Sequence, residues 1–193
     1  IPARLFPNEL ENVSTYNGRI WGVPYTHSLQ LCFYRKDLFN DPDLCAAFEK
    51  KYQVKLAPPT TWSMFNTISA FFTKSKNRHS PTQYGTAIFG GAAENLCTEL
   101  FPRIWSCGGM IIDQRGLVRL YSKENLKAFE SLIKTISCSN PNIMESTAFA
   151  ALSKLASREI ALCIGFSNNA TLLADKPAGV SPIQIGFSPI PHQ

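Results

Sequence analysis

The sequence predicts an α/β domain in which a largely parallel or mixed sheet is flanked by helices. Short apolar runs that suit strands are separated by helical patterns of about ten to fifteen residues, the order found in α/β domains. A length of 193 residues suits one domain with a sizeable core. Hydrophobic residues make up 45% and charged residues 17%, which are ordinary values for a folded globular chain.

The first elements follow from turn and capping residues. The pair Asn-Gly at 17–18 predicts a tight turn, because both residue types tolerate the positive φ that such turns need. The strand pattern after it contains Pro24, which predicts an edge strand or a bend. Alternation in "LQLCFY", residues 29–34, predicts a second strand. Asp41 before Pro42 predicts the cap of a helix.

The central part of the chain is predicted to be mainly helical. Two prolines followed by Thr61 predict a helix start, with an apolar stripe at helical spacing. That stripe consists of Trp62, Phe65, Ile68 and Phe72. "YGTAIF", residues 84–89, predicts a short buried strand. A wide helical face then comprises Leu96, Cys97, Leu100, Phe101, Ile104 and Trp105. Pro102 within this helix predicts a kink or a first turn.

The remaining elements alternate between strands and helices. "GGMIIDQRGLVRLYS" predicts a hairpin with Gly116 in the turn. Ser122 predicts the cap of the next helix, whose apolar residues are Leu126, Phe129, Leu132, Ile133 and Ile136. A shorter helix carries Phe149, Leu152 and Leu155. "IALCIGF" predicts an apolar strand, and "IQIGFSPIPHQ" predicts a final strand that two prolines end.

The charge distribution argues against a nucleic-acid-binding protein, and the apolar runs are too short for a transmembrane helix. Lysine and arginine number 19 against 14 acidic residues, which gives a net charge of +5. The short basic cluster at 74–79 predicts a solvated loop, since a nucleic-acid surface would need more basic residues on one face with aromatic residues between them. No nucleic-acid partner is therefore expected. No apolar run has the length of a bilayer-spanning helix.

The six cysteines are predicted to be small thiols within the core. No C-x-x-C pair occurs, and most of the cysteines stand inside apolar patterns, so a disulfide framework or a zinc site is the weaker interpretation. They are Cys32, Cys45, Cys97, Cys107, Cys138 and Cys163. No metal and no cofactor are expected.

Polar side chains that follow the predicted strands are the first candidates for a ligand site. In open α/β sheets, ligands gather beyond the carboxyl ends of the strands. The residues placed there are Tyr25, Thr26, His27 and Ser28, then Glu94 and Asn95, then Ser167, Asn168 and Asn169.

Five segments, in this order, resemble a known family. They are "YNGRIWGVPYTHSLQLCFYRKDLF", "PPTTWSMF", "WSCGGMIIDQRG", "SREIALCIGFSNN" and "IGFSPIP". Each is common alone, but together they span nearly the whole chain. The set resembles the family-1, sugar-binding branch of the extracellular solute-binding proteins of bacterial ABC importers, which includes maltose-binding proteins. The resemblance implies a periplasmic-binding-protein type II fold, in which two α/β lobes close on a ligand by a hinge.

The resemblance also implies what the chain is and does. Residues 1–193 would be the carboxy-terminal lobe alone, with the amino-terminal lobe encoded on both sides of it. The implied function is non-catalytic capture of a carbohydrate, an oligosaccharide, and its delivery by hinge closure to the membrane permease subunits of an importer. The parent protein would be extracytoplasmic, anchored to the membrane as a lipoprotein. Self-association of the isolated lobe is expected through the face that the other lobe would cover.

Two departures from the family pattern affect the expected ligand site. Relatives often carry an acidic residue at or near Ser28, where this chain has "YTHS". Tyr25, His27 and Ser28 then offer uncharged donors and acceptors, although Tyr25 is equally well read as hinge packing and His27 as a surface residue. Many relatives carry a sugar-stacking tryptophan where this chain has Asn168 and Asn169, which indicates hydrogen bonding there, or else a solvated turn.

The predicted helix at 94–106 supplies the other candidates. Glu94 and Asn95 stand where relatives place polar ligand contacts, although Glu94 also suits the first turn of a helix. Trp105 offers either a stacking face for the ligand or a member of the core stripe. Gly109 allows a close approach of the backbone to a ligand, whereas Gly108 is read as the helix end.

Two other functions remain as alternatives. A thiol-dependent hydrolase would pair Cys107 or Cys163 with His27 or His79, but the sequence has no nucleophile elbow, zinc-protease motif, phosphate loop or papain-type cysteine signature. A protein-interaction module would use the same cleft face to dock a partner, and a large exposed apolar patch would favour it.

Overall fold

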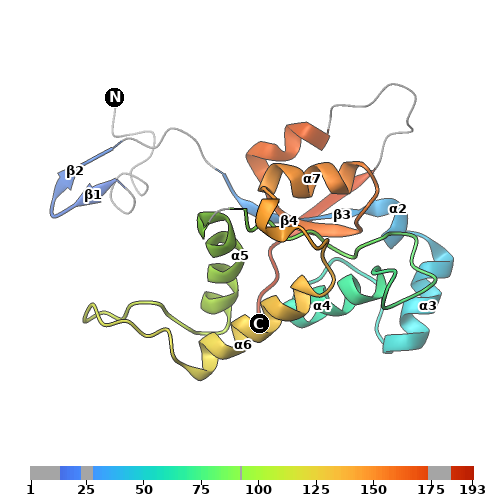
Figure 1. Ribbon diagram of the computed structural model, residues 1–193, viewed down its shortest axis with the longest axis horizontal. Helices are drawn as coiled ribbons and strands as arrows, with labels where there is room; N and C mark the ends of the chain where they lie inside the picture. The colour runs from blue at the N-terminus through green and yellow to red at the C-terminus, as the bar shows by residue number, and fades with distance from the viewer. Residues whose placement is uncertain (1–13, 23–27, 92, 174–183) are drawn as a thin grey trace.

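A three-stranded sheet with helices on both faces organises the molecule. The structure is a computed structural model and describes residues 14–22, 28–91, 93–173 and 184–193. Strand β3 (Gln30–Arg35) is central, between β4 (Leu162–Phe166) and β5 (Ile185–Pro189), as Figure 1 shows. The α/β fold class is confirmed. Within the described sheet both pairings are antiparallel, and a parallel contact is present as a single bridge between Thr61 and His192.

The described helices are α2 (Lys36–Phe39), α3 (Pro42–Tyr52), α4 (Trp62–Phe71), α5 (Ala93–Ser106), α6 (Lys123–Ile136) and α7 (Ala148–Ala156), with 3-10 turns η1 (Ile143–Glu145) and η2 (Ser167–Leu173). Three of the helices begin at the capping residues that the sequence predicts. Asp41 caps α3 by accepting from the amides of residues 43 and 44. Thr61 and Ser122 cap α4 and α6, each accepting from the amide three residues later. All three predicted caps are confirmed.

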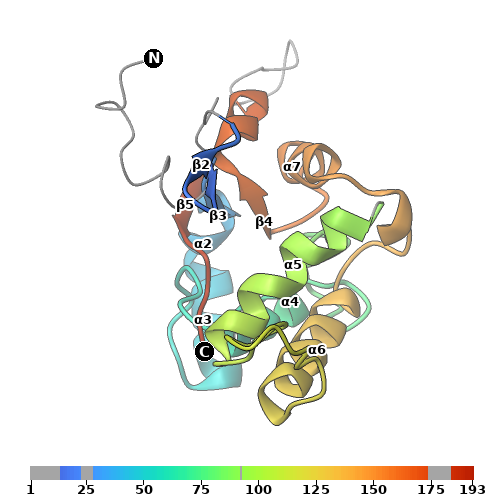
Figure 2. The same ribbon diagram turned by 90° about the vertical axis from the view of Figure 1, so that its left-hand side faces the viewer.

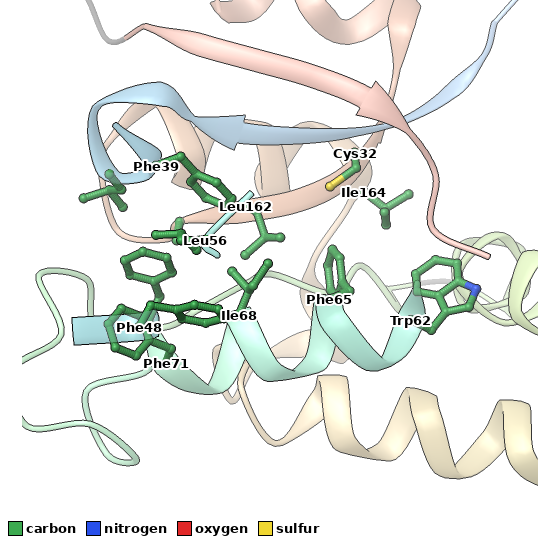
Figure 3. Packing of buried hydrophobic residues seen from close by; sticks show 13 residues of the cluster. Cys32, Phe39, Phe48, Leu56, Trp62, Phe65, Ile68, Phe71, Leu162 and Ile164 are labelled. Atoms are coloured by element: carbon green, nitrogen blue, oxygen red, sulfur yellow. The ribbon is translucent and has the colours of Figure 1, made fainter. Parts of the chain in front are cut away.

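The sheet separates two hydrophobic clusters, so β3 is buried on both faces. Cys32 points to the cluster under α2, α3 and α4, and Phe33 points to the cluster under α7. The predicted stripe of α4 lies in the first cluster, with its four members at most 2% exposed. Figure 3 shows Phe65 and Ile68 of this stripe packed beneath Leu162 and Ile164 of β4. Figure 2 shows α7 and α4 on opposite sides of the sheet.

The first hairpin has the predicted turn but short strands. β1 (Thr15–Tyr16) pairs antiparallel with β2 (Arg19–Ile20). Asn17 and Gly18 take φ of 50° and 70°, which is the geometry of a two-residue hairpin turn. The expected edge or bend at Pro24 lies outside the described residues.

Two predicted strand segments are irregular in the structure. Residues 85–89 are buried as predicted, but the 84–89 segment forms no strand, because three of its amides donate to residues 138 and 139 rather than to a neighbouring strand. The amides of Gly85 and Thr86 donate to the Cys138 carbonyl, and Ile88 donates to Ser139 Oγ. The 110–121 segment turns at Gly116 as predicted, but its ladder is reduced to one bridge between residues 112 and 118.

The apolar residues of α6 divide between the core and the surface. Ala128 and Leu132 are buried, whereas Leu126, Phe129 and Ile133 stand exposed on an adjacent stripe. The exposed stripe follows the 110–121 hairpin, which also exposes large apolar side chains, among them Ile112, Val118 and Tyr121. Among the described helices, none is both long enough and apolar enough to cross a bilayer.

Candidate functional site

The start of β3 meets the end of β4, and this junction joins two of the predicted site residues. Ser28 Oγ donates to Asn168 Oδ1 at 2.8 Å. The backbones on either side are tied together, since Leu29 N donates to Ser167 Oγ at 3.0 Å and Ser167 N donates to the Leu29 carbonyl at 2.9 Å. Because β3 and β4 run antiparallel, a residue that precedes β3 lies beside one that follows β4. Both Ser28 and Asn168 are exposed to solvent.

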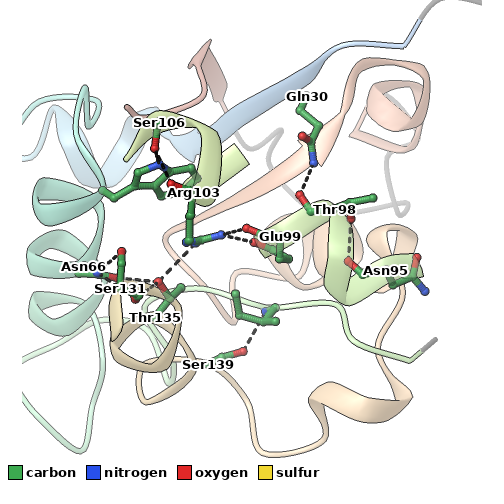
Figure 4. Close-up of polar contacts among 12 residues, drawn as sticks. Gln30, Asn66, Asn95, Thr98, Glu99, Arg103, Ser106, Ser131, Thr135 and Ser139 are labelled. Atoms are coloured by element: carbon green, nitrogen blue, oxygen red, sulfur yellow. Dashed lines mark hydrogen bonds and ion pairs between the residues drawn. The ribbon is translucent and has the colours of Figure 1, made fainter. Parts of the chain in front are cut away.

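Gln30, the first residue of β3, connects this junction to helix α5. Gln30 Nε2 donates to the Thr98 carbonyl of α5 at 2.9 Å, as Figure 4 shows. In a regular helix that carbonyl would accept from the amide of residue 102, but Pro102 has no N–H. Gln30 therefore occupies an acceptor that the proline leaves vacant. Thr98 Oγ1 in turn donates to the Asn95 carbonyl at 2.7 Å.

We call Ser28, Gln30, Asn95, Thr98 and Asn168 the junction cluster. These side chains are hydroxyls and amides, which donate and accept hydrogen bonds and carry no charge. Such a set suits an uncharged ligand rich in hydroxyl groups rather than an ion. Asn169 lies half-buried in the same turn η2 as Asn168.

The structure does not describe the side chains of three predicted site residues. Tyr25 and His27 lie outside the described residues. Glu94 belongs to the first turn of α5, and its side chain is also outside what the structure describes.

Trp105 lies on the outer face of α5 rather than in the core. Its side chain is 61% exposed, and its ring centroid is 5.7 Å from that of Phe101. The aromatic pair therefore remains available for contacts outside the core.

Gly109 lies beyond the carboxyl end of α5, away from the junction cluster at its amino end. A Cβ at this position would lie 2.1 Å from Asn125 Oδ1 and 3.0 Å from the Ile104 carbonyl. The absence of a side chain thus lets the end of α5 pack against the start of α6. Gly108 ends the helix as predicted, with φ of 76°.

A buried ion pair, which the sequence analysis did not identify, fixes which side of α5 is buried and which side is exposed. Arg103 Nη1 donates to Glu99 Oε2 at 2.9 Å, and the two side chains are at most 1% exposed. The guanidinium also lies 3.9 Å from the centre of the Trp62 ring on α4. Burial raises the pKa of the Glu99 carboxyl, and Arg103 offsets part of that rise. The i, i+4 spacing of Glu99 and Arg103 was the signal available in the sequence.

The polar network continues from Arg103 into α6. Arg103 Nη2 donates to Thr135 Oγ1 at 3.4 Å, and Thr135 Oγ1 donates to Asn66 Oδ1 at 2.6 Å (Figure 4). Trp62 Nε1 donates to Ser106 Oγ at 2.9 Å. α4, α5 and α6 are thereby held together on the side of α5 opposite Trp105.

A separate groove of about 530 Å³ runs between α4 and α6. Its lining includes Lys76, Lys127 and Lys134 with Glu130 and Asn66. None of the predicted site residues lines this groove, and it lies away from the junction cluster.

Burial disfavours the thiolate form of several cysteines. All six fall in the described part of the chain and are free thiols, three of them buried. Burial raises the pKa of Cys32 to about 12 and that of Cys163 well above its usual value, so neither is a thiolate near neutral pH. Burial also raises the pKa of Cys107, whose thiol donates to Gln193 Oε1. Among the described residues, no group of three His, Cys, Asp or Glu side chains is placed to hold a metal ion.

Comparison with known proteins identifies the fold. No protein-family model and no curated protein sequence matches the chain. Among solved structures, a ribitol-bound ABC-transporter solute-binding protein from Agrobacterium radiobacter K84 matches with a TM-score of 0.73 and 22% identity, over 95% of this chain and 42% of that one. Maltose-bound MalE3 from T. maritima matches at 0.70 and 21%, over 93% and 42%. A D-mannitol-bound solute-binding protein from Agrobacterium vitis S4 matches at 0.69 and 20%, over 93% and 40%.

These likenesses confirm, at the level of the fold, the resemblance seen in the sequence. The chain folds like one part of an ABC-transporter solute-binding protein and spans less than half the length of the structures it matches. The solved structures that it matches are of solute-binding proteins rather than enzymes.

Proposed function

We propose that this chain is a non-catalytic solute-binding module for a carbohydrate or a related polyol. The observation that carries the proposal is the junction cluster, on a fold shared with proteins that hold ribitol, maltose and mannitol. Sugars and polyols are neutral and present many hydroxyl groups, each of which donates and accepts. An uncharged set of hydroxyls, amides and a helix carbonyl matches that chemistry, and each buried hydroxyl left unpaired would cost about 1–3 kcal/mol.

Further parts of the proposal rest on the fold alone. The chain would be the carboxy-terminal lobe of a two-lobed protein, and the lobes would close on the ligand by a hinge. The loaded protein would deliver its ligand to the permease subunits of an ABC importer, outside the cytoplasm and on a lipoprotein anchor. Tyr25, His27, Glu94, Asn95, Asn169 and Gly109 remain candidate ligand contacts beside Ser28, Asn168 and Trp105.

Ligand screening of the chain tests the proposal. Ribitol, mannitol, maltose and longer neutral oligosaccharides are titrated into ¹⁵N-labelled protein, because chemical shifts report the weak binding expected when one lobe supplies half of the contacts. The largest perturbations are expected at residues 28–30, 95–98 and 167–169. If no sugar or polyol shifts these amides while an amino acid, a polyamine or a metal ion does, the carbohydrate assignment is wrong.

A further inference from the structure

The groove between α4 and α6 has polar walls on both sides. The α6 wall is formed by residues at positions i, i+3, i+4 and i+7, which share one face of the helix. They are Lys127, Glu130, Ser131 and Lys134. The α4 wall is also polar and includes Asn66 and Thr67. The volume of about 530 Å³ is within the range of small-molecule sites, but the lining favours a polar ligand.

Hydrogen bonds between the two helices hold the walls of this groove together. Asn66 Nδ2 donates to the Ser131 carbonyl at 3.1 Å and to Ser131 Oγ at 3.2 Å, as Figure 4 shows. Asn66 Oδ1 accepts from Thr135 Oγ1 at 2.6 Å. The groove therefore exists before a ligand arrives, and binding does not have to order it.

Three lysines determine the charge of the groove. Lys127 and Lys134 come from α6, whereas Lys76 comes from the basic cluster at 74–79, which the sequence analysis interprets as a solvated loop. Lys76 Nζ donates to Ser137 Oγ at 2.6 Å, and this bond brings the loop to the end of α6. Within the described part of the chain, none of the three ammonium groups forms an ion pair with a carboxylate. Their charges are therefore available to a ligand.

The positive charges lie at two separate ends of the groove. Lys127 and Lys134 are seven residues apart, which at about 1.5 Å per residue places them about 10 Å apart along the helix axis. Ser137, which binds Lys76, follows Lys134 by less than one helical turn. Two ammonium groups thus belong to one end and one to the other. Glu130, the one acidic residue among those that line the groove, stands between Lys127 and Lys134 and disfavours a negative charge in the middle of a ligand.

We propose that this groove is a second binding site, for a small molecule with a phosphate or carboxylate group at each end and an uncharged middle. Lysine binds such groups as a point charge, and the hydroxyls of Thr67 and Ser131 supply hydrogen bonds between the two ends. The net charge of +5 adds a general attraction for anions. No member of the junction cluster lines the groove, so this site is independent of the proposed function.

Fructose 1,6-bisphosphate is a suitable probe, because fructose 6-phosphate and fructose are matched compounds that lack one or both phosphates. Each is titrated into ¹⁵N-labelled protein at low ionic strength. We expect the bisphosphate to shift the amides of residues 63–70 and 127–137, to bind about fivefold more tightly than fructose 6-phosphate, and to bind more weakly as sodium chloride is added. Suberate, a dicarboxylate, distinguishes the two anionic groups, since shifts at the same amides with suberate show that carboxylates also bind. Fructose should leave these amides unshifted, and any shift that it causes at residues 28–30 bears on the proposed function alone.

Variants of α6 test whether the groove itself binds the anion. Lys127→Gln and Lys134→Gln are each expected to weaken bisphosphate binding about fivefold, because each removes a favourable charge. Glu130→Gln is expected to strengthen it, because it removes an unfavourable charge. Lys123→Gln is the matched control, since Lys123 is an exposed lysine of α6 outside the groove, and it should leave binding unchanged. All four side chains are exposed, so circular dichroism should show an unchanged fold.

Three results would each overturn the second site. They are groove amides that no anion shifts, equal losses in Lys123→Gln and Lys127→Gln, and equal affinities for fructose 6-phosphate and the bisphosphate. None of them would contradict carbohydrate binding at the junction cluster, which the neutral sugars test separately.

Discussion

Ser28 and Asn168 are hydrogen-bonded at 2.8 Å although 140 positions separate them in the sequence. Neither side chain carries a charge, and the two contact each other directly. If both contact the ligand, as the proposed function requires, their effects on binding are expected to be coupled.

Substitution of either residue tests this coupling. Ser28→Ala and Asn168→Ala are each expected to weaken sugar binding about fivefold, equivalent to about 1 kcal/mol, and the double variant is expected to lose less than the sum of the two. Because both side chains are exposed, unfolding in urea should change by less than about 1 kcal/mol. Asn142→Ala, at an exposed position distant in sequence from the cluster, serves as the control. Fully additive losses would argue against a shared site.

The Gln30–Thr98 bond is expected to depend on Pro102. Gln30→Leu leaves the Thr98 carbonyl without its donor and should destabilise the fold by about 1 kcal/mol in urea denaturation. Pro102→Ala restores a helical N–H for the same carbonyl, so adding Gln30→Leu to that variant should cost much less. An undiminished effect in the Pro102→Ala background would show that the helix does not compete for this acceptor.

Breaking the buried ion pair is expected to be far more damaging than replacing it. Glu99→Ala leaves the Arg103 guanidinium buried without its counter-charge and should cost about 3–5 kcal/mol. Glu99→Leu combined with Arg103→Met removes both charges at similar volume, and its stability should return to near that of the unsubstituted chain. Guanidinium-chloride unfolding followed by circular dichroism measures both variants. A double variant as unstable as Glu99→Ala would mean that the pair itself stabilises the fold.

Self-association is expected through the exposed apolar residues of α6 and the 110–121 hairpin. Leu126 and Ile133 are 58% and 64% exposed, and a second copy is the partner expected to cover them in a solution of this chain alone. Light scattering after size exclusion should show mass rising with concentration. Leu126→Lys with Ile133→Lys should abolish the rise, whereas Val54→Lys, at an exposed position elsewhere, should not. Persistent association in the double lysine variant would place the contact on another face.

The local elements were predictable because their signals are short-range. Asp41, Thr61 and Ser122 each cap a helix through an amide two or three residues away, so their sequence neighbourhood contains the whole interaction. The α4 stripe and the turn at Asn17 follow for the same reason. The α/β class followed from the order of these elements.

The relations between distant segments were not predictable in this way. The apolar patterns of β3, β4 and β5 do not indicate that these strands pair antiparallel. The pairing of β3 with β4 is what brings Ser28 next to Asn168. Residues 84–89 have the composition of a strand, but their hydrogen bonds go to the Cys138 carbonyl and Ser139 Oγ. The role of Gln30 depends on a proline seventy-two positions later, a pairing that no local periodicity encodes.

The central position of β3 has a consequence for synthesis in the cell. Both neighbours of β3, strands β4 and β5, are translated more than a hundred residues after it. Until then its two edges have no permanent partner, a condition in which nascent chains recruit chaperones or aggregate. Pairing then requires closure of very long loops, which makes collapse onto this strand a slow, late event. We expect chains truncated before residue 162 to remain bound to holdases, and chains that include residue 189 to be released.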